Sequence, residues 1–410
     1  MTFSAGDLPH DANGTIPGTR QPNHMNHMLG VQIRSAVLAA LVLATAPSLV
    51  VSQVPTTRDS VIPILPPKLS LPAEIASAGI TKFSFIAYGD TRGRHDGFEL
   101  QAEHTLVVES MLATISRAAT TNDPIKFVLQ SGDAVVNGAI AKQFTVSYVP
   151  LINRLTQVAG VPYFLSVGNH DVGNAIDLAD ARRVDGLRNY FAANASLIPA
   201  EGSPRRLNGY PTYAFGYGNT FFVAFDSDIP DDSAQFTWVK SQLEHLDRRR
   251  FPNIAMFFHH PPFSSGPHGG ARVERQAASI RAKWMPLIRA HHVRLLLTGH
   301  EHLFEHWIER YTDASGTHRI DEIVSGGGGA PLYGYTGEPD LQAYIAAGAG
   351  QKIAVEHRVR PAFEPGANPF HYVVVHVDGT NISVDVVGVD WGRGFQPYRS
   401  SAASLNDLTP

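Results

Sequence analysis

Five short stretches of the sequence carry residues that bind metals or transfer protons, and four of them also contain glycine. In chain order they are Gly89-Asp90, Gly132-Asp133, Gly168-Asn169-His170-Asp171, His259-His260 and Gly299-His300-Glu301-His302. Carboxylates, an amide oxygen and imidazoles are ligands for borderline transition metals such as Zn, Mn, Fe or Ni. The set is too large for one tetrahedral ion. It favours two ions that are bridged by a carboxylate and activate a shared hydroxide for in-line attack.

The composition limits what else the chain could do. Its 410 residues include 19 histidines and no cysteine, which excludes disulfides, thiolate nucleophiles and cysteine-ligated metals. Hydrophobic residues make up 43% and charged residues 17%, as in a folded globular protein rather than a disordered one. The formal charge of -4 provides no overall basic field, so no nucleic-acid binding is expected.

Each of the five stretches directly follows a short apolar run. These runs predict strands over residues 83–89, 125–132, 162–168, 253–260 and 293–299. Amphipathic patterns predict helices over residues 100–118, 140–158, 180–195, 231–247 and 273–290. Further strands are predicted over residues 220–227, 304–311 and 318–326, and a hairpin over 372–389. Strands that alternate with helices indicate an α/β fold, in which ligands collect beyond the carboxyl ends of strands.

The first 80 residues differ from the rest of the chain. Residues 1–28 are polar, and form either a disordered leader or a stretch before the true start. A positive residue, an apolar run and small residues then predict a signal peptide over 29–52, which would anchor the chain in a membrane if uncleaved. Residues 53–80 are rich in Pro and Ser and predict a linker. The folded domain is expected over 81–400, in a secreted or periplasmic protein.

The ordered set of motifs resembles the calcineurin-like metallophosphoesterase superfamily, over about residues 82–389. The resemblance implies an α/β fold that is a four-layer sandwich of two mixed β-sheets flanked by helices. It also implies an enzyme that hydrolyses a small phosphate ester with two divalent or mixed-valence transition-metal ions, with Mn, Zn or Fe expected. The sequence leaves open the oligomeric state and the choice between a phosphomonoester and a phosphodiester.

The resemblance further implies six metal ligands. They are Asp90, Asp133, Asn169, His259, His300 and His302. Asp133 would bridge the two ions. Asp90 and His302 would hold the first ion, and the other three residues would hold the second. His260 adjoins His259, and the sequence leaves open which of the two is the ligand.

Three further residues are expected to act on the substrate. His170 resembles the family's histidine beside the metals, which stabilises the phosphate or protonates the leaving group, and Asp171 would orient it. Arg92 stands where most members carry the histidine of Asp-x-His. Purple acid phosphatases also lack that histidine and use a Tyr three residues after the bridging Asp, where this chain has Val136. Water or His95 could complete the first site, and Arg92 could either clamp a phosphate or pair with a carboxylate.

The missing histidine also favours an alternative, a non-catalytic protein of the same fold that serves as a binding scaffold. Retention of all the other expected ligands favours the enzyme. The loops 172–210 and 264–275 are expected to set the shape of the substrate. Residues 325–331 predict a flexible glycine-rich turn at the rim of the pocket, and Tyr333 and Tyr335 either line its wall or pack elsewhere.

Overall fold

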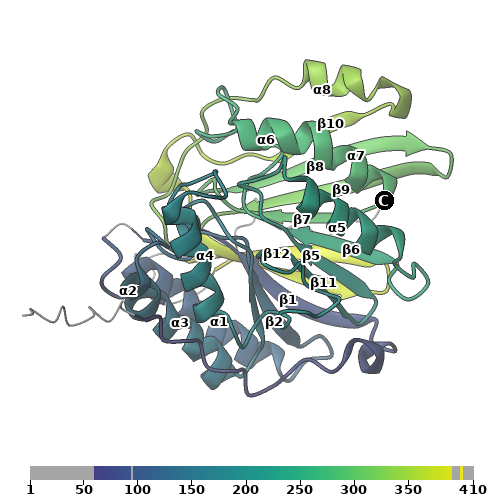
Figure 1. Ribbon diagram of the computed structural model, residues 1–410. Coiled ribbons are helices and arrows are strands. Elements are labelled where there is room, and N and C mark those ends of the chain that lie inside the picture. The colour runs from purple at the N-terminus through teal and green to yellow at the C-terminus, as the bar shows by residue number, and fades with distance from the viewer. Residues whose placement is uncertain (1–59, 94–95, 390–397, 400–410) are drawn as a thin grey trace, which may run out of the picture. The chain divides into compact units, whose positions relative to one another are not determined.

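The computed structural model describes residues 60–93, 96–389 and 398–399. Two mixed β-sheets lie face to face, with helices on the outer side of each (Figure 1). This arrangement confirms the α/β sandwich of two mixed sheets flanked by helices. The expected leader and signal peptide, residues 1–52, lie outside the described residues, as does His95.

The first sheet has six strands from both ends of the domain. They are β1 (Lys82–Tyr88), β2 (Ile125–Gln130), β3 (Tyr163–Leu165), β11 (Phe370–Asp378), β12 (Asn381–Val389) and β13 (Tyr398–Arg399). The order across the sheet is β13-β12-β11-β1-β2-β3. β1, β2 and β3 pair in parallel, and β1 pairs antiparallel with β11. The carboxyl ends of the three parallel strands therefore share one edge of the sheet.

The second sheet has seven strands. They are β4 (Tyr213–Tyr217), β5 (Thr220–Ala224), β6 (Asn253–Phe257), β7 (Leu295–Thr298), β8 (Phe304–Asp313), β9 (Gly316–Ser325) and β10 (Ala354–Val359). The order is β10-β8-β9-β7-β6-β5-β4, with β5, β6, β7 and β9 parallel. The sequence pattern did not predict β4 or β10. β10 is an edge strand with mostly exposed or half-buried side chains, so it lacks a strong apolar pattern.

The helices follow the predicted positions with local differences. The longer ones are α1 (Ala102–Ala118), α4 (Ala181–Ala193) and α5 (Ser233–Glu244). The run 141–159 consists of α2 (Ala141–Gln143), η2 (Phe144–Tyr148), α3 (Val149–Arg154) and η3 (Leu155–Ala159). The run 275–290 consists of α6 (Arg275–Ser279), η5 (Ile280–Trp284) and α7 (Met285–Ala290). The short elements are η1 (Glu74–Ser77), η4 (His170–Val172), α8 (Gln342–Ala347), η6 (Ala349–Gln351) and η7 (Pro365–Ala367).

Proline explains two of the three π-helical turns inside the composite helices, η2 and η5. Pro150 and Pro286 lie at the first turn of α3 and α7, directly after the wide turns η2 and η5. A proline inside a helix lacks an amide donor, and its ring clashes with the carbonyl four residues earlier. A wide turn before the proline removes that clash and lets the helix continue.

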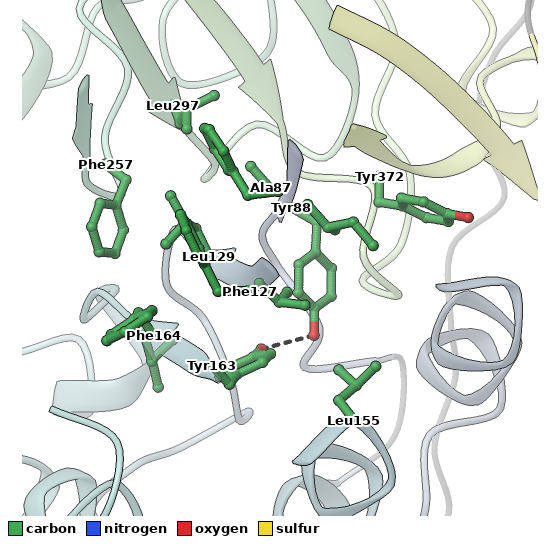
Figure 2. Close-up of a cluster of buried hydrophobic side chains, with 14 of the residues drawn as sticks. Ala87, Tyr88, Phe127, Leu129, Leu155, Tyr163, Phe164, Phe257, Leu297 and Tyr372 are labelled. Carbon is green, nitrogen blue, oxygen red and sulfur yellow. Dashed lines mark hydrogen bonds between the residues drawn. The ribbon is translucent and has the colours of Figure 1, made fainter. Parts of the chain in front are cut away.

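Aromatic side chains fill the space between the sheets. Phe127 of β2 is fully buried, and its ring centroid lies 5.2 Å from that of Phe85 and 5.3 Å from that of Phe222 in the second sheet. Figure 2 shows Phe127 among other buried rings, together with the 2.8 Å hydrogen bond between the hydroxyls of Tyr88 and Tyr163. A second core lies between the other face of the seven-stranded sheet and the helices α5 and α7. Apolar packing thus holds the two sheets face to face and the helices against the second sheet.

Part of the predicted linker is attached to the domain. Ile64 is 1% exposed and donates its amide hydrogen to Ala193, while the amide of Leu65 donates to the Asn153 side chain. The amide of Leu69 donates to Gly160. This stretch therefore runs along α3 and α4 as an ordered arm. In the part of the chain that the structure describes, we find no helix with the length and apolar character needed to cross a bilayer.

Candidate metal centre

The carboxyl ends of strands from both sheets meet at one place. The Asp90 Oδ2 atom, after β1, accepts a hydrogen bond of 2.9 Å from the backbone amide of His300, after β7. The Asp133 Oδ1 atom, after β2, accepts one of 3.0 Å from the amide of His170 and lies 3.3 Å from His259 Nε2. Loops that are distant in the sequence thus bring their side chains into one cluster, as expected for parallel strand ends.

The backbone at three of these residues is in the left-handed region. The φ angles are 62° at Asp90, 54° at Asp133 and 68° at His300. Few non-glycine residues adopt this conformation, and they concentrate at functional sites. It turns the chain sharply after the strand and directs each side chain into the cluster. The expected ligand residues themselves therefore make the turns that the glycine-containing motifs indicate.

The glycines serve mainly to leave room. A Cβ atom on Gly89 would lie 2.3 Å from Ser131 Oγ, and one on Gly299 would lie 2.4 Å from Asp90 Oδ2. Gly132 also has a positive φ of 106°, and its Cβ would lie 2.7 Å from the His259 ring. Side chains of the cluster therefore occupy the space that any larger residue at these positions would need.

Hydrogen bonds to backbone carbonyls fix the protonation of two histidines. His259 Nδ1 donates to the Ser131 carbonyl at 2.9 Å, and His302 Nδ1 donates to the Pro331 carbonyl at 2.7 Å. A carbonyl only accepts, so the proton of each neutral ring sits on Nδ1 and the Nε2 lone pair faces the cluster. Burial keeps both rings neutral, because it lowers the pKa of His259 to about 3 and that of His302 well below its ordinary value.

His300 presents its other nitrogen. Its Nε2 atom donates to Glu274 Oε2 at 3.0 Å, so its Nδ1 lone pair faces His259 Nε2 at 3.1 Å. The Asn169 Oδ1 atom also lies 2.9 Å from His259 Nε2. Three acceptor atoms therefore meet without a proton between them, a repulsive arrangement that a cation would relieve.

The carboxylates support the same conclusion. Asp90 Oδ1 is buried without a hydrogen-bond partner and lies 3.5 Å from His302 Nε2. Burial, and then the nearby Asp133 carboxylate, raise the pKa of Asp90 well above its ordinary value, which means that the Arg92 charge does not offset the burial of two carboxylates. Asp90, Asp133 and His259 each offer one ligand atom within 4.8 Å of the others. The donor set of carboxylates, imidazoles and an amide oxygen therefore fits transition-metal ions.

Arg92 extends into the same cluster. Its Nε atom lies 3.5 Å from Asp133 Oδ2, and its Nη2 atom lies 3.5 Å from His302 Nε2. The guanidinium thus lies beside two of the expected ligands of the first ion, and both of the roles expected for it, a carboxylate partner and a phosphate clamp, are within reach. The carbonyl of Val136, the residue at the position of the Tyr in purple acid phosphatases, accepts a hydrogen bond of 2.6 Å from His170 Nδ1.

Asp171 has a different role from the one expected. Its Oδ1 atom accepts hydrogen bonds from the amides of Ala134 and Val135, and its Oδ2 atom accepts one from the amide of Gly168. The Val136 carbonyl, rather than Asp171, orients the His170 ring. Asp171 instead ties the loop after β3 to the loop after β2, which sets the position of His170 through the backbone.

The structure separates His259 from His260. His260 is buried beside a different group, with Nδ1 2.9 Å from Ser227 Oγ and Nε2 3.8 Å from Asp228 Oδ1. His259 points instead to Asp133 and Asn169. His259 is therefore the member of the pair that lies beside the expected bridging carboxylate, whereas His260 offers a ligand atom within 4.8 Å of those of Glu274 and His300.

A cleft of about 430 Å³ opens beside the cluster and is formed partly by residues that the motifs did not indicate. His268 Nδ1 donates to Glu274 Oε1 at 2.7 Å, and the His268 ring centroid lies 4.5 Å from that of His300. Both residues belong to the loop 264–275 that was expected to shape the substrate site. Nothing in the local sequence distinguishes them from surface residues. Asn169, Asp228, His260, His268, Arg272, Glu274 and His300 are among the residues that line the cleft.

The glycine-rich segment differs from the flexible rim turn that its composition predicts. Residues 325–330 are all buried, and the amides of Gly328 and Ala330 donate to the carbonyls of Gly89 and Asp90. A Cβ atom on Gly328 would lie 2.3 Å from the Gly89 carbonyl, so only glycine permits this approach. The segment therefore packs directly beneath the loop that carries Asp90.

The two tyrosines that follow lie in different surroundings. The ring of Tyr333 stacks on His302 with a centroid distance of 4.1 Å. Tyr335 instead contacts Phe363, and its hydroxyl donates to Glu338 at 3.3 Å. Tyr333 thus backs one of the expected ligands, while Tyr335 packs elsewhere.

Comparisons with known proteins show which proteins this chain is similar to. Purple acid phosphatase 18 of Arabidopsis thaliana is 24% identical over 145 residues, which cover 35% of this chain and 30% of the relative. Probable inactive purple acid phosphatase 9 of the same plant is 28% identical over 106 residues, 25% of this chain and 15% of the relative. The chain therefore spans less than a third of the length of either relative.

Two further comparisons identify the fold and the family of this chain. The solved structure of the purple acid phosphatase PPD1 from yellow lupin (Lupinus luteus) seeds superposes with a TM-score of 0.53 at 15% identity, covering 78% of this chain and 53% of that one. Residues 87–304, slightly more than half of the chain, match the family described as calcineurin-like phosphoesterase. They include every expected ligand. This chain belongs to the calcineurin-like phosphoesterase family.

Proposed function

We propose that this protein is a metal-dependent phosphoesterase with a dinuclear centre, which hydrolyses a small phosphate ester in the cleft beside His268 and Glu274. One observation carries the proposal. The Nε2 atom of His259, the Nδ1 atom of His300 and the Oδ1 atom of Asn169 meet as three acceptors, next to two buried carboxylates. Such a group of atoms is stable only around positive charge.

The cluster offers enough donors for two ions that share Asp133. Asp90 and His302 would hold one ion, and Asn169, His259 and His300 the other. When bound, such ions would supply Lewis-acid activation of water and of the phosphoryl group. Manganese, zinc and iron all suit this mixture of oxygen and imidazole donors.

The chain itself would position the ester and move the proton. His170 donates from Nδ1 to a backbone carbonyl, which leaves Nε2 as the atom that exchanges a proton with the leaving group. The planar fork of Arg92 matches two phosphate oxygens and lies at the mouth of the cluster, 17% exposed. Arg272 lines the adjacent cleft and adds positive charge where a phosphate would enter.

One observation favours a second candidate, a non-catalytic scaffold. The Arg92 guanidinium lies 3.5 Å from Asp133, where it would repel the first ion. One relative is described as a probable inactive purple acid phosphatase. In that case the cluster would bind one ion or none, and the partner surface would lie elsewhere.

A hydrolysis panel with a matched variant tests the proposal. The chain is supplied separately with Mn, Zn and Fe and assayed on an aryl phosphate, a bis-aryl phosphate and a cyclic nucleotide, while metal per chain is measured on the same samples. We expect about two ions per chain and turnover of at least one ester. His170→Ala should keep the ions and lower kcat by about 10²–10⁴. Full metal content without turnover on any ester would favour the scaffold.

A further inference from the structure

A second cluster of metal-binding side chains lies at the other end of the seven-stranded sheet. His292 precedes β7, whereas Asp313 is the last residue of β8 and His318 is the third residue of β9. The candidate metal centre follows the opposite end of β7, and β8 runs ten residues between the two places (Figure 1). At about 3.3 Å per residue, the separation is roughly 30 Å. The second cluster is therefore independent of the first.

The strand register brings the two histidines together. β7 and β9 are parallel, and Leu295 pairs with Asp321. His292 and His318 each lie three residues before this pair, so they lie side by side at the end of the sheet where β7 and β9 begin. Their rings stack with a centroid distance of 4.2 Å and an interplanar angle of 14°. His292 also has a φ angle of 51°, the left-handed conformation seen at three residues of the first cluster.

Both rings direct Nε2 toward one carboxylate. His292 Nε2 lies 2.8 Å from Asp313 Oδ2, and His318 Nε2 lies 2.9 Å from Asp313 Oδ1. One ligand atom from each of the three residues lies within 4.8 Å of the others. The side chains are 23–38% exposed, so an ion can enter from solvent and retain water as a further ligand. A hydrogen bond from the Ser315 hydroxyl lowers the pKa of Asp313, which keeps the carboxylate ionised.

We propose that His292, Asp313 and His318 form a second metal site, which binds one zinc-class divalent cation through two imidazole nitrogens and one carboxylate oxygen. Two imidazoles favour Zn²⁺, Ni²⁺, Co²⁺ or Cu²⁺ over the oxygen-seeking Ca²⁺ and Mg²⁺. When the ion binds, the proton of each neutral ring resides on Nδ1, and Nε2 becomes the ligand. The ion ties the β8–β9 hairpin to the turn before β7, and so stabilises this end of the sheet.

Metal counting on the full chain tests the site. The protein is freed of metal with a chelator and dialysed against Zn²⁺, and the bound zinc per chain is measured for wild type, His292→Gln/His318→Gln and Asp313→Asn. We expect both variants to bind one zinc fewer than wild type while their phosphoesterase activity is unchanged. His291→Gln removes a neighbouring imidazole outside the cluster and should bind as much zinc as wild type.

Two further measurements distinguish the loss of this site from misfolding of the variant and from metal that binds at the first cluster. The thermal midpoint of wild type should rise more on adding Zn²⁺ than that of the double variant, and circular dichroism should show the same fold for both. In wild-type protein loaded with Cu²⁺, electron paramagnetic resonance should detect a nitrogen-coordinated copper that the double variant lacks. Equal zinc content and equal spectra in the folded double variant and wild type would overturn the proposal, whether or not the protein hydrolyses phosphate esters.

Discussion

Asn in place of Asp133 is the most informative single substitution, because it removes a charge and changes little else. Asp133 has a φ angle of 54°, and Asn is among the few non-glycine residues that tolerate this region. Ala would add a left-handed backbone penalty of about 1–2 kcal/mol and leave a cavity. Asp133→Asn therefore reports on the carboxylate charge rather than on the backbone.

The magnitude follows from the distances around the carboxylate. His259 Nε2 and Arg92 Nε lie 3.3 Å and 3.5 Å from its two oxygens, so a cation among these residues would be within about 4 Å of the charge. At that distance, an effective dielectric constant of about 20 gives about 4 kcal/mol for each unit of cation charge. Its loss corresponds to at least about 1000-fold weaker metal binding. If Asp133 is shared, both ions are lost together and turnover disappears with them.

The metal-free protein should respond in a different way. The Asp133 charge helps to raise the pKa of buried Asp90, so its removal relieves a like-charge repulsion. We expect the free energy of unfolding without metal to change little, while the stabilisation that added Mn or Zn gives to wild type is lost. Aryl phosphate hydrolysis, metal content and thermal unfolding with and without metal measure the three effects.

A matched control is Asp180→Asn. Asp180 caps α4 through a hydrogen bond to the Arg182 amide, a role that Asn fills equally well. It should leave metal content and activity unchanged. If Asp133→Asn kept both ions and most of its activity, the assignment of Asp133 as the shared ligand would be refuted. If it lost only one ion, the carboxylate would serve a single metal.

Three further predictions address the support of the site, the core and the pH dependence of stability. A Cβ on Gly138 would lie 1.8 Å from the Asp171 carbonyl, so Gly138→Ala should displace the loop of His170 and lower kcat at least tenfold. Phe127→Ala should lower the free energy of unfolding by about 3–5 kcal/mol, measured in urea, because the ring is fully buried between the sheets. Burial alone would lower the pKa of His376. Its hydrogen bonds to Asp385 and Asp123 outweigh burial and raise this pKa above 6.5. Wild type should therefore exceed His376→Gln in stability below pH 6.5, and the difference should vanish as the pH rises through the folded pKa.

Each of these predictions has a control in the same chain. A Cβ atom on Gly350 would meet no neighbour within 4 Å, so Gly350→Ala should leave kcat unchanged. Phe363 is 74% exposed, and Phe363→Ala should alter stability by less than about 0.5 kcal/mol. In the hydrogen bonds described, the His245 side chain contacts only Ser241 of its own helix, so His245→Gln should alter stability by less than about 0.5 kcal/mol. Equal effects of a test variant and its control would contradict the corresponding prediction.

Local patterns in the sequence predicted the α/β class and the meeting point of the motifs, whereas the sandwich of two sheets was implied by the family resemblance. An apolar run that stops at Gly89-Asp90 or Gly132-Asp133 marks the end of a parallel strand, and parallel strands end on the same edge. The same rule could not separate His259 from His260, since both follow β6, and the preference for His259 came from the family resemblance. Strands without an apolar pattern, such as β10, could not be predicted in this way.

Sequence patterns could not predict which groups form hydrogen bonds with the residues of the site. Asp171 was expected to orient His170, but its carboxylate accepts hydrogen bonds from three backbone amides instead. The close approach of Gly138 to the Asp171 carbonyl brings the two loops together. Glu274 contacts His300 only because the loop after β6 folds back over the cluster. Such contacts depend on how two loops meet in space, for which neither spacing nor residue type gives a signal.

The strain in the cluster bears on the choice between enzyme and scaffold. Asp90, Asp133 and His300 are all in the left-handed region, at a cost of about 1 kcal/mol or more each, and Asp90 is buried with an unpartnered oxygen. The free energy of unfolding of a typical domain is only about 5–15 kcal/mol, so these costs are a considerable fraction of it. A scaffold that binds partners on its outer surface gains nothing from such an arrangement. If the cluster binds cations, the cost is recovered, since each strained residue would direct a ligand atom at the ions. The protein should then lose stability steeply when metal is removed.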